Sequence, residues 1–193
     1  AFAAIKEDGS VVTWGNNNSG GDSSEIANDL SSGIVEIVSS NIAFAAIKEN
    51  GSVVTWGDFE NGADSSAVVG DLSSGIVEIV SNSGAFAAIK DDGSIVTWGH
   101  DAYGGDSSEV AIKLSSDVVK IVSSNLAFAA IKEDGSVLTW GHDTYGADTS
   151  EVSNDLSSGI VEIISNDGAF AAIKEDGSVV TWGSDVNMSD LPE

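Results

Sequence analysis

The sequence contains no cysteine, no arginine and only two histidines. Without cysteine there are no disulfides, and so few histidines do not favour a zinc site. Its seven basic residues, all lysine, face 31 acidic ones, for a formal net charge of −24. Nucleic-acid binding requires basic side chains that neutralise phosphates, so the charge excludes a nucleic-acid partner. No apolar run approaches the roughly 20 residues of a membrane-spanning helix, so membrane insertion is not expected.

What the sequence does contain is one unit that repeats without a gap. The stretch AFAAIKEDGSVVTWG opens the chain and returns nearly unchanged four times, with a period of 42 residues. A unit of this size cannot bury a core alone, but stacked units can. We therefore predict a single array over residues 1–183. Its parts are units 1–42, 43–84, 85–126 and 127–168, a partial unit 169–183, and a C-terminal tail, 184–193.

Each unit predicts a β-hairpin followed by a third strand. In the first unit, apolar runs at 1–6 and 10–15 flank Glu7-Asp8-Gly9, and an Asp-Gly pair is typical of tight hairpin turns. Asn50 takes the place of the aspartate in the second unit. Successive residues of a strand point to opposite faces, and both runs carry apolar residues on both faces. This pattern indicates strands that are covered on both sides.

The third strand is predicted at 34–38, IVEIV, which leads directly into the next hairpin, so the expected sheet order is third strand, then hairpin. Its central residue is Glu36 in the first unit but Lys120 in the third. A charge of either sign at one register indicates solvent exposure near a sheet edge. The segment 22–33 predicts a short helical turn that ends at Gly33, with an irregular loop as the alternative.

The motif AIKEDGSVVTWG, preceded by VEIVSSNI, resembles the repeat of the regulator of chromosome condensation family. The resemblance implies an all-β fold of tandem antiparallel repeats arranged as a β-propeller. An open β-solenoid or superhelical array is the alternative, because the chain has five hairpins but four third strands. The best-known activity of that family is nucleotide exchange on a small GTPase at chromatin, and none of its functional residues can be placed here. The pattern is also similar to near-identical arrays in large bacterial surface or secreted proteins.

One aspartate per repeat follows a glycine-containing turn and is a candidate calcium ligand, since calcium prefers hard oxygen donors. The spacing of known calcium loops is absent, which favours a helix-capping role, with calcium as the alternative. No other cofactor is expected. The four candidates are Asp22, Asp64, Asp106 and Asp148.

The segments that differ most between copies follow the Trp-Gly pair: NNNSGG, DFENGA, HDAYGG and HDTYGA. Such variation predicts exposed loops, where a specific partner would bind. The candidate ligand-binding residues are Phe59, His100, Tyr103, His142 and Tyr145. The five tryptophans could form a binding face, but at the end of a buried strand they are expected to lie in the core.

Together these features predict a non-enzymatic structural or adhesive scaffold, extracellular or at the cell surface, that self-associates. These predictions are based on the ungapped period, on the hairpin motif that occurs at both ends of the array, on the strong negative charge and on the lack of a set of catalytic residues. The alternative is a lectin-like or protein-binding propeller that binds a glycan or another protein through its loops.

Overall fold

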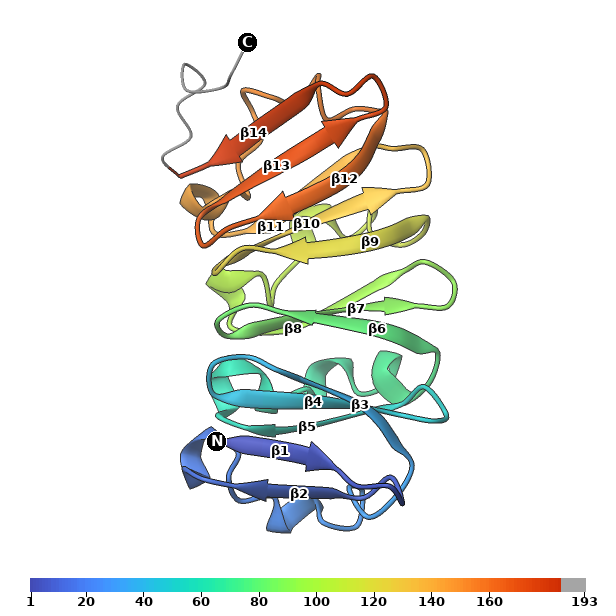
Figure 1. The fold of residues 1–193 in the computed structure, drawn as a ribbon, viewed down its shortest axis with the longest axis vertical. Helices are drawn as coiled ribbons and strands as arrows, with labels where there is room; N and C mark the ends of the chain where they lie inside the picture. The colour runs from blue at the N-terminus through green and yellow to red at the C-terminus, as the bar shows by residue number, and fades with distance from the viewer. Residues whose placement is uncertain (185–193) are drawn as a thin grey trace.

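The structure, a computed structural model, describes residues 1–184. Its strands form one two-stranded and four three-stranded antiparallel sheets. The sheets follow one another along the long axis, and the N-terminus and the last described residues lie at opposite ends (Figure 1). The predicted all-β, propeller-like repeat array is confirmed, and over the described residues it is open. The predicted tail, 184–193, lies outside the described residues except for Ser184.

The strands are β1 (Phe2–Ile5), β2 (Val11–Trp14), β3 (Ile34–Ser39), β4 (Ala43–Lys48), β5 (Val53–Gly57), β6 (Ile76–Ser81), β7 (Ala85–Lys90), β8 (Ile95–Gly99), β9 (Val118–Ser123), β10 (Ala127–Lys132), β11 (Val137–Gly141), β12 (Ile160–Ser165), β13 (Ala169–Lys174) and β14 (Val179–Gly183). The short helical turns are η1 (Asn17–Ser19), η2 (Ser24–Ile26), η3 (Phe59–Ala63), η4 (Ser66–Val68), η5 (Asp71–Ser73), η6 (Asp101–Tyr103), η7 (Ser108–Val110) and η8 (Asp143–Tyr145).

The hairpin turns form as the Asp-Gly pairs predict. Gly9 has a φ of 74°, a left-handed conformation that a side chain would strain. The Asp8 carboxylate accepts hydrogen bonds from the backbone N–H of Ser10 at 3.0 Å and from its hydroxyl at 2.6 Å. Asn50 makes the same two bonds with Ser52, at 3.0 and 2.7 Å. The turn therefore depends on a side-chain oxygen, whether charged or neutral.

Each complete sheet has the predicted order, third strand and then hairpin, as in β3-β4-β5. A sheet therefore combines the third strand of one sequence unit with the hairpin of the next. The third strand lies at the sheet edge, where Glu36 and its counterpart Lys120 are exposed, which confirms the edge prediction. Consecutive third strands are linked, because the Ser81 hydroxyl donates to the Ser39 carbonyl at 2.8 Å, 42 residues away.

The sheets stack face to face. On one face, the Phe–Trp face, the second sheet carries Phe44 and Trp56, whose rings stack with centroids 5.1 Å apart. On the opposite face, the alanine face, it carries Ala43, Ala45 and Ile47. At each junction the Phe–Trp face of one sheet packs on the alanine face of the sheet before it. The strands β4, β7 and β10 are buried along all but their last residue, so the prediction of strands covered on both sides is confirmed for the middle of the array.

The segment between hairpin and third strand contains single helical turns, in agreement with the predicted turn. In the first repeat η2 is followed by a hydrogen bond from the Leu30 N–H to the Ile26 carbonyl, and Leu30 is 2% exposed. The corresponding leucines of the other repeats are buried to the same degree: Leu72, Leu114 and Leu156. These leucines fix the long segment against the core.

Candidate binding surfaces

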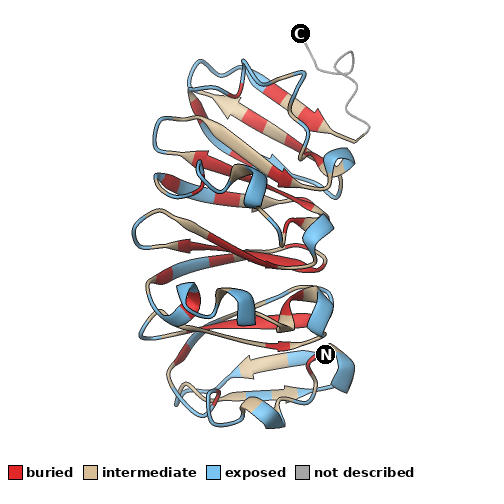
Figure 2. Cartoon of the chain, turned by 180° about the vertical axis from the view of Figure 1, so that it is seen from behind, coloured by how far each residue is buried: buried red, intermediate tan, exposed pale blue. Residues whose placement is uncertain are grey.

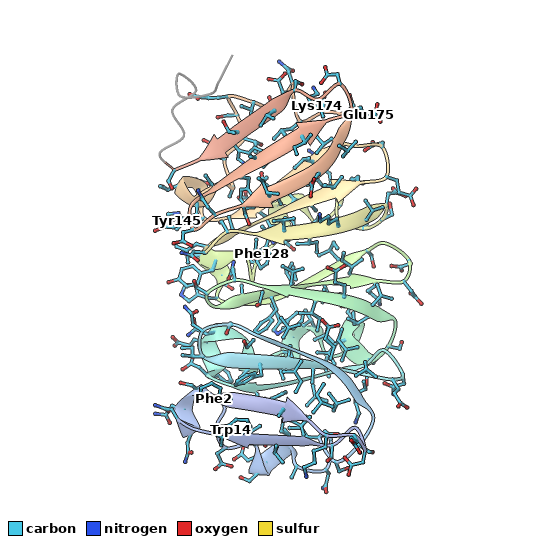
Figure 3. The ribbon with its side chains drawn as sticks, viewed as in Figure 1. Phe2, Trp14, Phe128, Tyr145, Lys174 and Glu175 are labelled. Atoms are coloured by element: carbon cyan, nitrogen blue, oxygen red, sulfur yellow. The ribbon has the colours of Figure 1, made fainter. Side chains whose placement is uncertain are left out.

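The two ends of the stack expose opposite faces. At the N-terminal end the Phe–Trp face of the first hairpin is uncovered, and Phe2 and Trp14 are 63% and 50% exposed. Figure 3 shows both side chains on that hairpin, whereas Phe128 lies between two sheets. At the C-terminal end the alanine face of the last sheet exposes Ile164 and Val179. Figure 2 shows the same contrast, with buried residues in the inner sheets and no buried residue in β1 or β2.

Each internal junction closes with a hydrogen bond in addition to apolar packing. Trp98 is 4% exposed, and its indole Nε1–H donates to the carbonyl of Gly62 in the preceding loop at 3.1 Å. The bond recurs from Trp56 to Gly20 at 3.1 Å, from Trp140 to Gly104 at 3.1 Å and from Trp182 to Gly146 at 3.0 Å. The expectation that tryptophans lie in the core is therefore confirmed for four of them, and Trp14 is the exception.

Sequence analysis missed the role of the loop glycines that accept these bonds. The variable segments were predicted to be exposed, and their outer residues are, but Gly62 is buried against the ring of Phe86. Its φ of 110° and this contact both exclude a side chain. The signal in the sequence was a glycine that stays constant while the residues before it vary: Gly20, Gly62, Gly104 and Gly146.

Open grooves recur between consecutive loops. One groove of about 480 Å³ is lined by Asp22, Glu25, Trp56, Phe59 and Asp64, among others. Grooves at matching positions lie between the third and fourth repeats and between the fourth and fifth. Their lining combines carboxylates and hydroxyls with the edge of a buried indole, which suits a polar, extended partner better than a small apolar ligand.

The candidate calcium ligands each accept a local hydrogen bond. The Asp22 carboxylate accepts from the backbone N–H of Ser24 at 2.9 Å, and this bond, together with one from the Ser24 hydroxyl, lowers the pKa of Asp22. The other three aspartates make the same backbone bond at 2.9 Å and also have lowered pKa values: Asp64, Asp106 and Asp148. Within residues 1–184 no three acidic or histidine side chains are placed to hold a metal ion together. The predicted N-cap role is wrong in position, because the N-cap residues of η2, η4 and η7 are the serines that follow the aspartates, Ser23, Ser65 and Ser107. The aspartates stabilise the turn just before each helical turn, and calcium binding stays a prediction.

The histidine–tyrosine loops form two separate pairs. His100 stacks on Tyr103 with ring centroids 4.1 Å apart, and His142 meets Tyr145 edge-on at 5.3 Å. Both tyrosine rings also pack against core clusters, so they help to close the junctions. In each histidine the Nδ1 atom is buried without a hydrogen-bond partner. Binding by these residues stays a prediction.

Phe59 is the most accessible of the predicted binding residues, with 70% of its surface exposed at the rim of the first groove. It begins η3, where the Asp58 carboxylate accepts bonds from the backbone and side-chain nitrogens of Asn61 at 3.2 and 2.7 Å. This local bonding holds the loop while the phenyl ring projects into solvent.

Among residues 1–184, no helix is long and apolar enough to cross a bilayer.

The sequence matches no protein-family profile and no curated protein. Solved structures do match. Yeast RCC1 (Prp20) bound to Kap60 gives a TM-score of 0.60 at 16% identity, over 99% of this chain and 57% of that chain. Human WBSCR16 gives 0.56 at 14% identity, over 94% and 58%. Prp20p from Saccharomyces cerevisiae, in a structure reported with its binding to Gsp1p and histones, gives 0.54 at 16% identity, over 78% and 44%.

These similarities define the class of fold. The chain consists of RCC1-like β-propeller repeats, as the resemblance implied. It spans about half the length of these three chains. At identities of 14–16% the similarity concerns the scaffold, and what the neighbours bind does not transfer with it.

Proposed function

We propose that the chain is a non-enzymatic structural scaffold that binds protein partners and self-associates end to end. The observation that carries the proposal is the uncovered Phe–Trp face. Phe2 is 63% exposed, whereas its four counterparts are at most 7% exposed: Phe44, Phe86, Phe128 and Phe170. In the other four sheets the Phe–Trp face packs on an alanine face. The exposed Phe–Trp face of the first hairpin is therefore a candidate binding site for another alanine face.

The internal junctions indicate the orientation of the contact. Each of them joins a Phe–Trp face to an alanine face, and the alanine face of the last sheet, where Ile164 and Val179 are exposed, lies at the far end of the described residues. A second molecule would therefore dock head to tail. Contacts of this kind give rings where the rotation closes and filaments where it does not. A net charge of −24 opposes the approach of two copies, so association is expected to strengthen as salt rises.

Sedimentation velocity across protein and salt concentrations tests the proposal with two blocked variants. Phe2→Asp places a charge on the N-terminal Phe–Trp face, and Val179→Asp places one on the C-terminal alanine face. Each variant alone is expected to stay monomeric, and a mixture of the two is expected to form a dimer of one copy of each. Val77→Asp, at a valine that is 57% exposed on a sheet edge, is the matched control and is expected to associate like the unaltered chain.

Two results would contradict the proposal in different ways. An unaltered chain that remains monomeric at every concentration and salt would overturn self-association. Dimerisation of the Val179→Asp variant alone would show that two Phe–Trp faces meet, which would overturn the head-to-tail arrangement and leave self-association standing.

The second candidate function is binding of another protein or a glycan in the inter-repeat grooves. It is favoured by the recurrence of a groove with the same lining at several junctions, which permits multivalent contact. Structures of this fold have been described in complex with Kap60 and with regard to Gsp1p and histones, which makes a protein partner the first to test. Phe59→Ala is expected to weaken such binding, and Val69→Ala, at a residue 66% exposed, is the control.

We further propose that the protein is extracellular or at the cell surface and has no enzymatic activity. The acidic composition suits solubility in such a setting. Each histidine lies beside the tyrosine of its own loop, and the sequence has no cysteine to act as a nucleophile. Surface biotinylation of intact cells tests the location, because an intracellular chain would escape labelling.

A further inference from the structure

We propose that the Asn50-Gly51 pair is a modification site, at which the folded chain converts its own asparagine to aspartate and isoaspartate with loss of ammonia. The chain contains two Asn-Gly pairs, Asn50-Gly51 and Asn61-Gly62. A glycine after the asparagine favours the reaction, because it has no side chain to hinder attack by its backbone nitrogen. The surroundings of the two pairs differ, and they assign the reaction to the first pair. The proposal does not depend on any partner of the chain.

The first pair lies at the tip of the hairpin that joins β4 to β5. Asn50 is exposed, and the Gly51 N–H donates to the Lys48 carbonyl at 2.8 Å, which closes the turn. This bond must open before the Gly51 nitrogen can attack. The opening of an exposed turn costs little compared with unfolding of the whole chain. The reacting atoms can therefore meet while the sheets stay packed.

Ser52 holds the side chain of Asn50 in a reactive arrangement. The Oδ1 atom of Asn50 accepts hydrogen bonds from the Ser52 backbone N–H at 3.0 Å and from the Ser52 hydroxyl at 2.7 Å. The first bond spans the Gly51 peptide, so it keeps the amide carbon beside the Gly51 nitrogen. Negative charge develops on Oδ1 when the amide carbon is attacked, and donors directed at such an oxygen lower the barrier.

The reaction consumes water and releases ammonia. The Gly51 nitrogen gives its proton to hydroxide and forms a bond to Cγ of Asn50, and the amide nitrogen leaves as ammonia with a proton from water. The product is a cyclic succinimide, which water opens at either carbonyl. Opening at Cγ gives aspartate. Opening at the main-chain carbonyl of Asn50 gives isoaspartate, in which the backbone runs through the former side chain.

The second pair is protected because it lies in a closed junction. Gly62 is buried against the ring of Phe86, and its carbonyl accepts the hydrogen bond from the Trp98 indole at 3.1 Å. The side-chain nitrogen of Asn61, which would have to leave, donates to the Asp58 carboxylate at 2.7 Å. Attack at this pair requires the junction between two sheets to open. We therefore expect the folded chain to spare Asn61.

The two products have different effects on the turn. Aspartate occupies this register in the other four hairpins and makes the same bonds, as Asp8 does with Ser10. Isoaspartate adds a carbon to the backbone and displaces the Gly51 carbonyl, which accepts from the Ile76 N–H at 3.0 Å at the start of β6. Aspartate should therefore preserve the junction between the second and third sheets, and isoaspartate should weaken it.

The test is peptide mapping by mass spectrometry after incubation of the full chain in mildly alkaline water enriched in heavy oxygen. Opening of the succinimide places heavy oxygen in the product, so only conversion during the incubation is counted. In the folded chain we expect Asn50 to be labelled at least about a hundredfold faster than Asn61, and in urea the two rates should be similar. An unlabelled Asn50 in the folded chain, after a time that labels the unfolded chain, would overturn the proposal. Equal labelling of both asparagines in the folded chain would also overturn it.

A pair of serine variants tests the arrangement of the turn. Ser52→Ala removes the hydroxyl donor and keeps the backbone donor. It should slow the labelling of Asn50 severalfold in the folded chain and leave the rate in urea unchanged, because the hydroxyl is positioned only in the turn. Ser94→Ala removes the corresponding bond to Asp92 in the next hairpin and is the matched control. Unchanged or faster labelling in the folded Ser52→Ala variant would refute the role of Ser52.

The separated products test the effect on the junction. The aspartate form should have the melting temperature of an Asn50→Asp variant, and the isoaspartate form should melt at a lower temperature. Equal melting temperatures of the two forms would refute the weakening of the junction.

Discussion

The same substitution at two registers of the repeat should have very different consequences for stability. Trp98→Phe removes the indole N–H that bonds the Gly62 carbonyl across a closed junction. A buried carbonyl left without a partner costs about 1–3 kcal/mol, so we expect the free energy of unfolding to fall by that amount. Trp14 stands at the same register but is 50% exposed, and within residues 1–184 its indole makes no hydrogen bond like that of Trp98. Trp14→Phe should therefore stay within about 0.5 kcal/mol of the unaltered chain.

The assay is urea unfolding followed by far-ultraviolet circular dichroism, at a protein concentration where the chain is monomeric. Both variants should keep the slope of the unaltered chain, because neither changes how much surface unfolding exposes, and only the midpoint of Trp98→Phe should move. An equal loss in the free energy of unfolding for both variants would refute the reasoning. It would mean that the hydrogen bond across the closed junction adds no stability beyond the contacts that the tryptophan makes within its own hairpin.

Two further predictions concern the turns and loops. Gly104→Ala should lower the melting temperature in a thermal unfolding experiment, because the φ of 99° disfavours a side chain and the new Cβ would lie 2.8 Å from the ring of Phe128. Gly70→Ala is the control: its Cβ would meet open space, so the melting temperature should stay the same or rise slightly. The hydroxyl and backbone N–H of Ser94 lower the pKa of Asp92 below 3.8, so its contribution to stability is present above about pH 4 and is lost as the pH falls further. A variant with asparagine at all the turn aspartates should therefore retain more stability than the unaltered chain in acid denaturation, with Asn50 as the natural precedent, and identical acid curves would contradict it. Those aspartates are Asp8, Asp92, Asp134 and Asp176.

Much of the fold could be predicted because its determinants are local. The Asp8-Gly9 pair specifies the turn, and the uninterrupted apolar strands indicate cover on both sides. The charge at Glu36 and Lys120 places the third strand at an edge. These inferences need only short segments of the sequence and a comparison of the repeats at one register. The structure agrees with the turn and the edge, and with cover on both sides for the middle of the array.

The binding surfaces could not be predicted in the same way, because identical residues acquire different roles from their neighbours. Phe2 and Phe44 lie in identical AFAAIKE segments, yet one is 63% exposed and the other 7%. The difference is that the first hairpin packs on Phe44, whereas within residues 1–184 no sheet packs on Phe2. Similarly, Tyr103 was expected in an exposed loop, and only the folded stack shows that its ring packs against the neighbouring repeat's core. Position within the array carries this information, and residue type does not.

The links between third strands have a consequence for how such a chain can change. The Ser81, Ser123 and Ser165 hydroxyls each donate a hydrogen bond to a carbonyl 42 residues earlier, and every three-stranded sheet is shared between two sequence units. Removing or inserting 42 residues at any phase of the repeat therefore recreates a junction that already exists in the molecule. Recombination between copies at the gene level would lengthen or shorten the stack one sheet at a time, without a new interface to be selected. Copy number is thus a property that can vary while the fold stays constant.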